Sequence, residues 1–376
     1  MTKRVKYIYL DREYETFKLE LDSCFNSIMS QGLFILREDV ERFEQAVCER
    51  LNTKHCIGVN SGTDALRLSI SALSLPKGSK VICPAHCFIS AVNALLEFNL
   101  VPSFVDINEE DHNINFARIK ETCDDQTSAI LVVHMNGIPA QMEEIVNFAK
   151  EKSLKVIEDS AQAFDSSLNG RSCGTFGDIG TLSMHPLKTL NAAGDAGAVI
   201  THSEQLAERV RALRNIGPRC KGKYDSFGYN SRLDNLQAKI LLQKLKHFDE
   251  MIIRRKNHSN NYREFFKKYD LSIPRPLNNT DQYRCTFSNF VIVTSRAESV
   301  RQNFENHNIE YLRAWFPPVY KANHLKKYNY MRKKFSVTDY IAENSINLPI
   351  HPLMTDNERE IVSCLVQRAL EKPIFS

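Results

Sequence analysis

Short apolar runs alternate with amphipathic segments from about residue 37 to residue 203. The segments between the runs space their apolar positions as one face of a helix does. The runs are typical of buried strands, at residues 80–83, 101–105, 129–133, 155–157, 179–183 and 198–201. Because strands that alternate with helices form a mostly parallel sheet covered on both faces, we predict an α/β fold.

The pattern changes in the second half of the chain. A long helix, rich in Leu, Lys and Gln, is predicted over residues 233–260. After Pro274, residues 285–295 alternate like an antiparallel strand, and two helical segments follow. We therefore predict a large domain at residues 1–250 and a smaller α+β domain at residues 251–376.

Composition narrows the class of protein. The chain of 376 residues is 43% hydrophobic and 25% charged, which is ordinary for a globular protein with two domains. No apolar stretch reaches membrane-spanning length, and the N-terminal segment lacks the apolar core of a signal peptide. The ten cysteines include no CxxC pair, so we expect reduced thiols in the cytoplasm and no metal site. A net charge of +4 is too small to favour nucleic acid as a partner.

Two residues at the ends of predicted strands are candidates for covalent chemistry. Lys188 lies in a loop between two apolar runs, and partial desolvation there would lower its pKa and make it nucleophilic. Asp159 ends the strand at residues 155–157, at the edge of the sheet where ligands gather. Its carboxylate could pair with a protonated pyridine nitrogen, or it could simply cap the next helix.

A third candidate for the site is the segment from Gly58 to Leu73, whose pattern predicts a turn followed by a helix. A turn of Ser61, Gly62 and Thr63 precedes a helical pattern. Such a helix N-terminus presents backbone N–H groups and a hydroxyl that suit a phosphate, although an ordinary capped helix has the same pattern. The turn is neither a Walker A loop nor GxGxxG, which argues against a nucleoside triphosphate and against an NAD-dependent oxidoreductase.

Together these elements resemble the DegT/DnrJ/StrS family of sugar aminotransferases, which use pyridoxal phosphate (PLP) and have fold-type I. Six motifs in the same order carry the resemblance over nearly the whole chain. They are residues 30–44, residues 134–145, VIEDSAQAF, GDIGTLSMHPLK, residues 228–241 and residues 348–358.

The resemblance implies a role for individual residues. Lys188 would bind PLP covalently and then act as general acid and base, and Asp159 would pair with the pyridine nitrogen as the second catalytic residue. Other residues would contact either the ring or the phosphate of the cofactor. Gln162 and Phe88 would contact the ring, and Gly62, Thr63 and Ser183 would hold the phosphate.

The resemblance also implies a homodimer with shared active sites. Asn230 and Arg232, in GYNSR, match family positions that reach the cofactor phosphate of the neighbouring subunit. A basic loop precedes them. Its Arg219, Lys221 and Lys223 would hold a substrate diphosphate or only keep the protein soluble.

The GDAG motif at residues 194–197 resembles members that aminate C-3 of a 3-keto nucleotide-linked deoxysugar with glutamate as donor. Such enzymes serve deoxyamino sugar biosynthesis, including that of O-antigen lipopolysaccharide. His185, Met184 and Asn136 depart from the common family residues, and Lys188 argues against the related dehydratases. Two alternatives remain: amination of a C-4 keto sugar or a cyclitol, and a PLP-binding regulatory protein without turnover.

Overall fold

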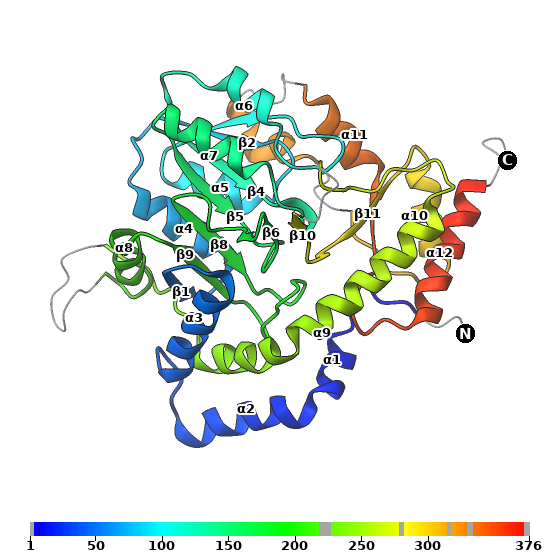
Figure 1. The fold of residues 1–376 in the computed structure, drawn as a ribbon, viewed down its shortest axis with the longest axis horizontal. Coiled ribbons are helices and arrows are strands. Elements are labelled where there is room, and N and C mark those ends of the chain that lie inside the picture. Colours follow the sequence, from blue (N-terminus) through cyan, green and yellow to red (C-terminus); the bar gives the residue numbers. More distant parts are fainter. Residues whose placement is uncertain (1–3, 218–226, 278–281, 314–316, 329–333, 372–376) are drawn as a thin grey trace.

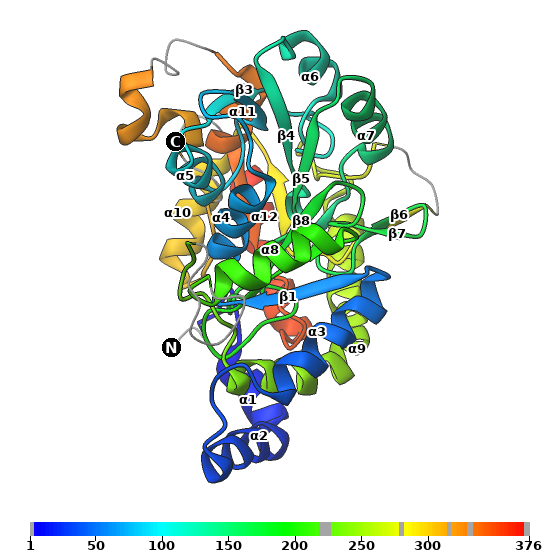
Figure 2. The same ribbon diagram turned by 90° about the vertical axis from the view of Figure 1, so that its left-hand side faces the viewer.

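The computed structural model describes residues 4–217, 227–277, 282–313, 317–328 and 334–371. Within these ranges the largest sheet has seven strands, with helices on both faces (Figures 1 and 2). The strand order is β1-β9-β8-β5-β4-β2-β3. The strands are β1 (His55–Val59), β2 (Lys80–Pro84), β3 (Val101–Val105), β4 (Thr127–Val133), β5 (Lys155–Asp159), β8 (Ile179–Ser183) and β9 (Gly197–Thr201).

The sheet is mostly parallel, which confirms the prediction. The strands from β3 to β8 pair in parallel, whereas β9 runs antiparallel to both of its neighbours, β8 and β1. Most positions of these strands are buried on both faces, as continuous Val, Ile and Leu runs require. The sequence pattern missed β1, an edge strand interrupted by His55 and Gly58.

Helices cover the two faces of the sheet. On one face the strands pack against α4 (Gly62–Leu73), α5 (Ile89–Glu97) and α8 (Glu204–Arg214). On the other face they pack against α6 (Phe116–Thr122), α7 (Met142–Glu151) and α3 (Glu38–Leu51), and against the first half of α9 (Asn235–Phe266). Figure 2 shows both layers from the side.

A second hydrophobic core lies beyond the sheet. Strands β11 (Phe290–Val293) and β12 (Ser345–Leu348) pair antiparallel and pack against α10 (Ala297–Asn306) and α12 (Asp356–Glu371). The predicted strand at 285–295 is shorter because Thr286 instead bonds to Ser166 of the large sheet's connections. Smaller elements lie around both cores. They are β6 (Ser167–Leu168), β7 (Arg171–Ser172), β10 (Tyr283–Arg284), α11 (Ser336–Asn344) and the 3₁₀ turns Met135–Gly137, Val319–Lys321 and Asn323–Tyr328.

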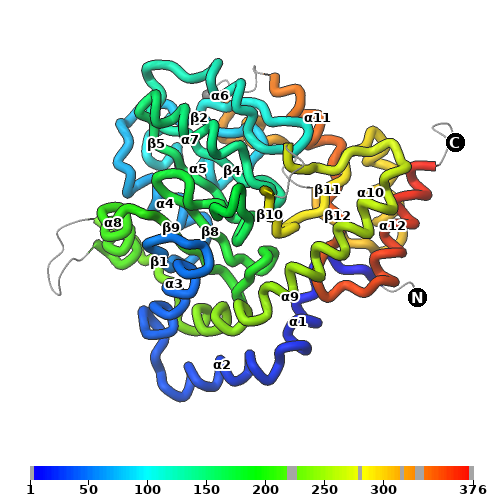
Figure 3. The backbone as a smooth tube through the Cα atoms, in the orientation of Figure 1, coloured from blue at the N-terminus to red at the C-terminus, as the bar shows by residue number. Residues whose placement is uncertain are grey.

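Helix α9 connects the two cores (Figure 3). It contributes Leu241 and Phe248 to the core under the sheet, and Tyr262 and Phe266 to the second core. The N-terminal segment also joins the second core through Val5 and Tyr9 before α1 (Leu10–Thr16) and α2 (Lys18–Gln31) return toward α9. The domain boundary near residue 250 falls within this continuous helix and stays a prediction. Among the described residues, no helix has the length and apolar character needed to span a bilayer.

Candidate active site

The carboxyl ends of several strands bring the predicted site residues to one edge of the sheet. Strand β5 ends at Asp159, β8 ends at Ser183, and the loop with Lys188 follows β8. Strand β1 runs in the same direction as β8 and leads into the turn at Ser61 and Gly62. Chain segments that are far apart in the sequence therefore meet here, as expected for an open α/β sheet.

Lys188 and Asp159 are close enough to perturb each other's ionisation. Burial lowers the pKa of Lys188, and the charge of Asp159 opposes this effect. Burial raises the pKa of Asp159, which the amide of Ala161 and the charge of Lys188 oppose. Asp159 is 5% exposed, and within the described part of the chain its carboxylate accepts one hydrogen bond, from the amide of Ala161 at 3.1 Å. A buried carboxylate with so few donors is suited to a cationic partner.

Glu158, the preceding residue, is already fully occupied. Its Oε1 accepts the amide of Gly177 at 2.6 Å, and its Oε2 accepts the amide of Gly174 at 2.8 Å. His134 lies 2.9 Å from Oε2, and its Nδ1 accepts the amide of Ala140. Because His134 Nδ1 is an acceptor, Nε2 carries the proton and donates to Glu158. Glu158 is therefore structural, and Asp159 is the carboxylate that faces the lysine.

A cradle suited to a phosphate lies where α4 begins. Ser61 caps the helix by accepting the Asp64 amide at 3.2 Å, as the alternative of an ordinary capped helix expects, and the phosphate-binding role of the turn stays a prediction. Among the described residues, the amides of Gly62 and Thr63 have no acceptor. A Cβ on Gly62 would lie 2.6 Å from the Cβ of Ser183, and a Cβ on Gly197 would lie 2.7 Å from the amide nitrogen of Gly62. The close approach of three segments requires both glycines.

Gln162 and Phe88 are the residues expected to contact a cofactor ring, a role that stays a prediction. Gln162 Oε1 accepts the Asn136 amide at 3.0 Å and the Asn289 carboxamide at 2.9 Å, which leaves its Nε2 as the donating group. Phe88 precedes α5 and is 52% exposed, although the two residues before it are buried. Sequence reasoning missed Asn289, because no local pattern links it to Gln162, which is 127 positions away.

The predicted intersubunit residues lie before α9. Asn230 is exposed and pairs with Asn215, whereas Arg232 is half-buried and its Nε has no partner among the described residues. Ser231 lies between them and contacts Asn60, next to the cradle, at 3.3 Å. Their role across a dimer stays a prediction. Arg219, Lys221 and Lys223 lie outside the described residues.

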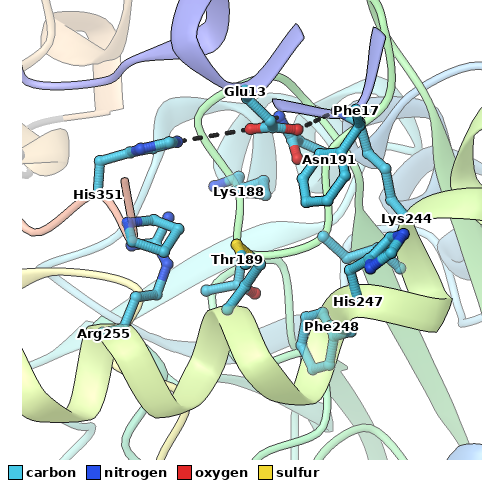
Figure 4. Close-up of a pocket in the computed structure, with 13 residues that line it drawn as sticks. Glu13, Phe17, Lys188, Thr189, Asn191, Lys244, His247, Phe248, Arg255 and His351 are labelled. Carbon is cyan, nitrogen blue, oxygen red and sulfur yellow. Dashed lines mark hydrogen bonds and ion pairs between the residues drawn. The ribbon is translucent and has the colours of Figure 1, made fainter. Parts of the chain in front are cut away.

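A small cavity lined by charged and apolar side chains lies beside Lys188, between α1, α9 and the residues before α12 (Figure 4). The sequence analysis assigned no role to its Glu13, Arg255 or His351. His351 belongs to a motif that carried the family resemblance, but no spacing rule connects it to the lysine loop. In the described part of the chain, no cluster of His, Cys, Asp and Glu side chains is arranged to hold a metal ion.

Comparison with known protein families shows which family this chain belongs to. Residues 17–366 match the DegT/DnrJ/EryC1/StrS aminotransferase family. The chain belongs to this family. It is therefore an aminotransferase by descent, and the expected resemblance is confirmed.

The relatives of this aminotransferase include sugar-modifying enzymes. It is 31% identical over 368 residues to the UDP-N-acetyl-3-dehydro-α-D-glucosamine 3-aminotransferase of Acidithiobacillus ferrooxidans, covering 97% of this chain and 98% of that one. It is 34% identical over 353 residues to the dTDP-3-amino-3,6-dideoxy-α-D-galactopyranose transaminase of Aneurinibacillus thermoaerophilus, covering 94% and 96%.

A solved structure confirms the fold. The structure of S. venezuelae DesV in complex with a ketimine intermediate superposes with a TM-score of 0.94 at 29% identity, covering 99% of this chain and 100% of that one. The predicted fold-type I architecture is therefore correct.

Proposed function

We propose that this aminotransferase converts a 3-keto nucleotide-linked deoxysugar into the 3-amino sugar, with PLP as cofactor and L-glutamate as amino donor. The observation that carries the proposal is that Lys188 and Asp159 are buried close enough to influence each other's pKa, at the sheet edge that also holds the glycine cradle. The GDAG motif and the two relatives that are named for 3-amino sugars support C-3 as the position. All cysteines of the described residues are free thiols, which supports a cytoplasmic location.

The residues present fit PLP. The unpaired amides of Gly62 and Thr63, with the Ser183 hydroxyl, would hold its phosphate at the positive end of α4. Asp159 would pair with its ring nitrogen, Gln162 Nε2 would donate to its phenolic oxygen, and Phe88 would cover one face of its ring. When bound, PLP supplies an electron-withdrawing ring and a carbon that carries the amino group between donor and acceptor.

Lys188 supplies both the covalent anchor and the proton transfer. Burial lowers the pKa of its amine, so a larger fraction is unprotonated and nucleophilic at neutral pH. With the cofactor bound, Nζ of Lys188 would remove a proton from the donor's α-carbon and would deliver it to the cofactor carbon that receives the amino group. The charge of Asp159 partly opposes the effect of burial and favours the protonated amine.

The exposed apolar residues of α2 and the turn after it support a dimer. Phe25, Met29, Leu33, Phe34 and Ile35 are each at least 38% exposed in one chain. Several exposed large apolar side chains within one short segment are typical of a subunit interface, and a second copy of this chain would cover them. In that dimer, Asn230 and Arg232 would complete the partner's phosphate site.

The decisive test is transamination by the purified protein. UDP-, dTDP- and GDP-linked keto sugars are each incubated with glutamate, and the amino sugar is identified by nuclear magnetic resonance. We expect an amine at C-3, with Lys188→Ala inactive and borohydride reduction labelling Lys188 in the wild type. An amine at C-4 would contradict the proposed substrate, and a label on a different lysine would contradict the site.

A further inference from the structure

The cavity beside Lys188 is rich in positive charge (Figure 4). Its basic and imidazole groups come from three parts of the chain, and within the described residues Glu13 is the one carboxylate among its lining side chains. Those cationic or titratable neighbours are Lys188, Lys244, His247, Arg255 and His351. A single buried carboxylate in such surroundings is held strongly by its neighbours.

Glu13 is fixed by contacts to three separate segments. It forms an ion pair with Lys244 of α9, lies 3.5 Å from His351 Nε2, and accepts a hydrogen bond from Asn191 at 3.4 Å. His351 Nδ1 accepts the Leu353 amide, so Nε2 carries the proton toward Glu13. Burial opposes ionisation, but His351 and Lys244 outweigh it and lower the pKa of Glu13 to about 2.

The contact with Asn191 connects Glu13 to the lysine loop. Asn191 is 5% exposed and follows Lys188 by three residues, with the buried Leu190 between them. Two positions further, Ala193 exchanges hydrogen bonds with Gln237 of α9, at 2.9 and 3.2 Å. The loop is therefore fastened at one point to α9 and at another to α1, by a side chain that is distant in sequence.

We propose that Glu13 is a positioning residue for the aminotransferase reaction: it holds Asn191 and thereby the backbone that carries Lys188. This inference rests on the proposed function, in which Lys188 is the reactive amine. Stability alone does not require the arrangement, because an apolar pair of similar volume is often as stable as a buried ion pair. What an apolar pair lacks is an acceptor for Asn191.

Four variants separate positioning from stability. Glu13→Met removes the acceptor and leaves Lys244 unpaired, and Glu13→Met/Lys244→Met removes both charges. Glu13→Gln keeps an acceptor for Asn191. Asp11→Asn is the matched control, because Asp11 lies on the same helix in an exposed ion pair with Lys6. The readouts are hydrogen exchange of the peptide spanning residues 184–193, the thermal midpoint, and kcat and KM for the keto sugar.

We expect Glu13→Met to speed exchange of the loop peptide about tenfold and to lower kcat about tenfold, with KM for the sugar within about twofold. The Met/Met variant should regain the thermal midpoint but keep the fast exchange and low kcat. Glu13→Gln should restore slow exchange, and Asp11→Asn should match the wild type. Recovery of exchange and kcat together with stability in the Met/Met variant would overturn the proposal. If the wild type transaminates no keto sugar, the proposed function fails, while the exchange data still test the role of Glu13.

Discussion

The close contact between Gly62 and Ser183 gives a sharp test of the phosphate cradle. In Gly62→Ala the new Cβ would lie 2.6 Å from Ser183 Cβ and 3.0 Å from its Oγ. An ordinary contact begins at 3.4 Å, so the turn and the strand end must separate by about 0.8 Å. That separation moves two of the groups proposed to bind the phosphate away from each other.

The expected loss of PLP affinity in Gly62→Ala follows from the hydrogen bonds to the phosphate that are lost. One charge-assisted hydrogen bond is worth about 1.5–3 kcal/mol, so losing one should weaken PLP binding roughly 10- to 100-fold. Stability should change less. Overpacking costs about 1–3 kcal/mol, but alanine at the start of α4 is a better helix former than glycine by up to about 1 kcal/mol.

The assay is titration of the cofactor-free protein with PLP, followed by absorbance, with the thermal midpoint measured in parallel. Gly180→Ala is the matched control. Gly180 lies in β8, the strand that ends at Ser183, and its added Cβ would clash with the carbonyl oxygen of Gly174 and lie 2.7 Å from its Cα, away from the cradle. We expect the control to lose thermal stability and keep its affinity for PLP. Gly62→Ala should instead lose affinity for PLP and keep most of its thermal stability. Wild-type affinity in Gly62→Ala would refute the cradle as the phosphate site.

The remaining predictions concern charge and assembly. Asp159→Asn should retain PLP but lose most turnover, measured as kcat, because the ring nitrogen loses its ionic partner; a near-normal kcat would exclude that role. The pKa of Glu13 is lowered from 4.5 to about 2, so its contribution of about 3 kcal/mol is complete above pH 4.5 and is lost as pH falls toward 2. Urea unfolding between pH 7 and 3 should therefore show a smaller loss in Glu13→Gln than in the wild type, and parallel curves would contradict this. Co-expressed Lys188→Ala and Arg232→Ala chains should recover activity as a purified heterodimer, whereas sites built within one chain would recover none.

Local patterns were sufficient to predict most of the sheet. Residues 80–83, 101–105 and 129–133 were predicted as strands because unbroken apolar runs are needed where both faces are buried. Edge strand β1 is also buried at most of its positions, but it is short and His55 and Gly58 leave it without an unbroken apolar run, so its pattern was missed. The long helix extends to Phe266 because its last two turns pack in the second core, which only tertiary structure determines.

The residues of the candidate site also differ in whether a local sequence pattern could predict them. Lys188, Asp159 and Gly62 carry signals in their own segments: a loop between apolar runs, a strand end and a helix start. Glu13 and Asn289 carry none, because each is defined by partners more than a hundred residues away. A buried polar contact between distant segments has no sequence period, so reasoning from spacing could not find it.

The neighbours Glu158 and Asp159 show why position in the fold, rather than residue type, assigns the chemistry. Successive side chains of β5 point to opposite faces of the sheet. Glu158 meets the amides of Gly174 and Gly177 on one face, and these donors fully compensate its charge. Asp159 points to the other face at the very end of the strand, where Lys188 is its nearest cation. A carboxylate with a saturated set of donors gains little from a new cation, whereas one with a single backbone donor gains much. The same buried pair of acids therefore supplies one structural anchor and one binding group, and a register shift of one residue would exchange them.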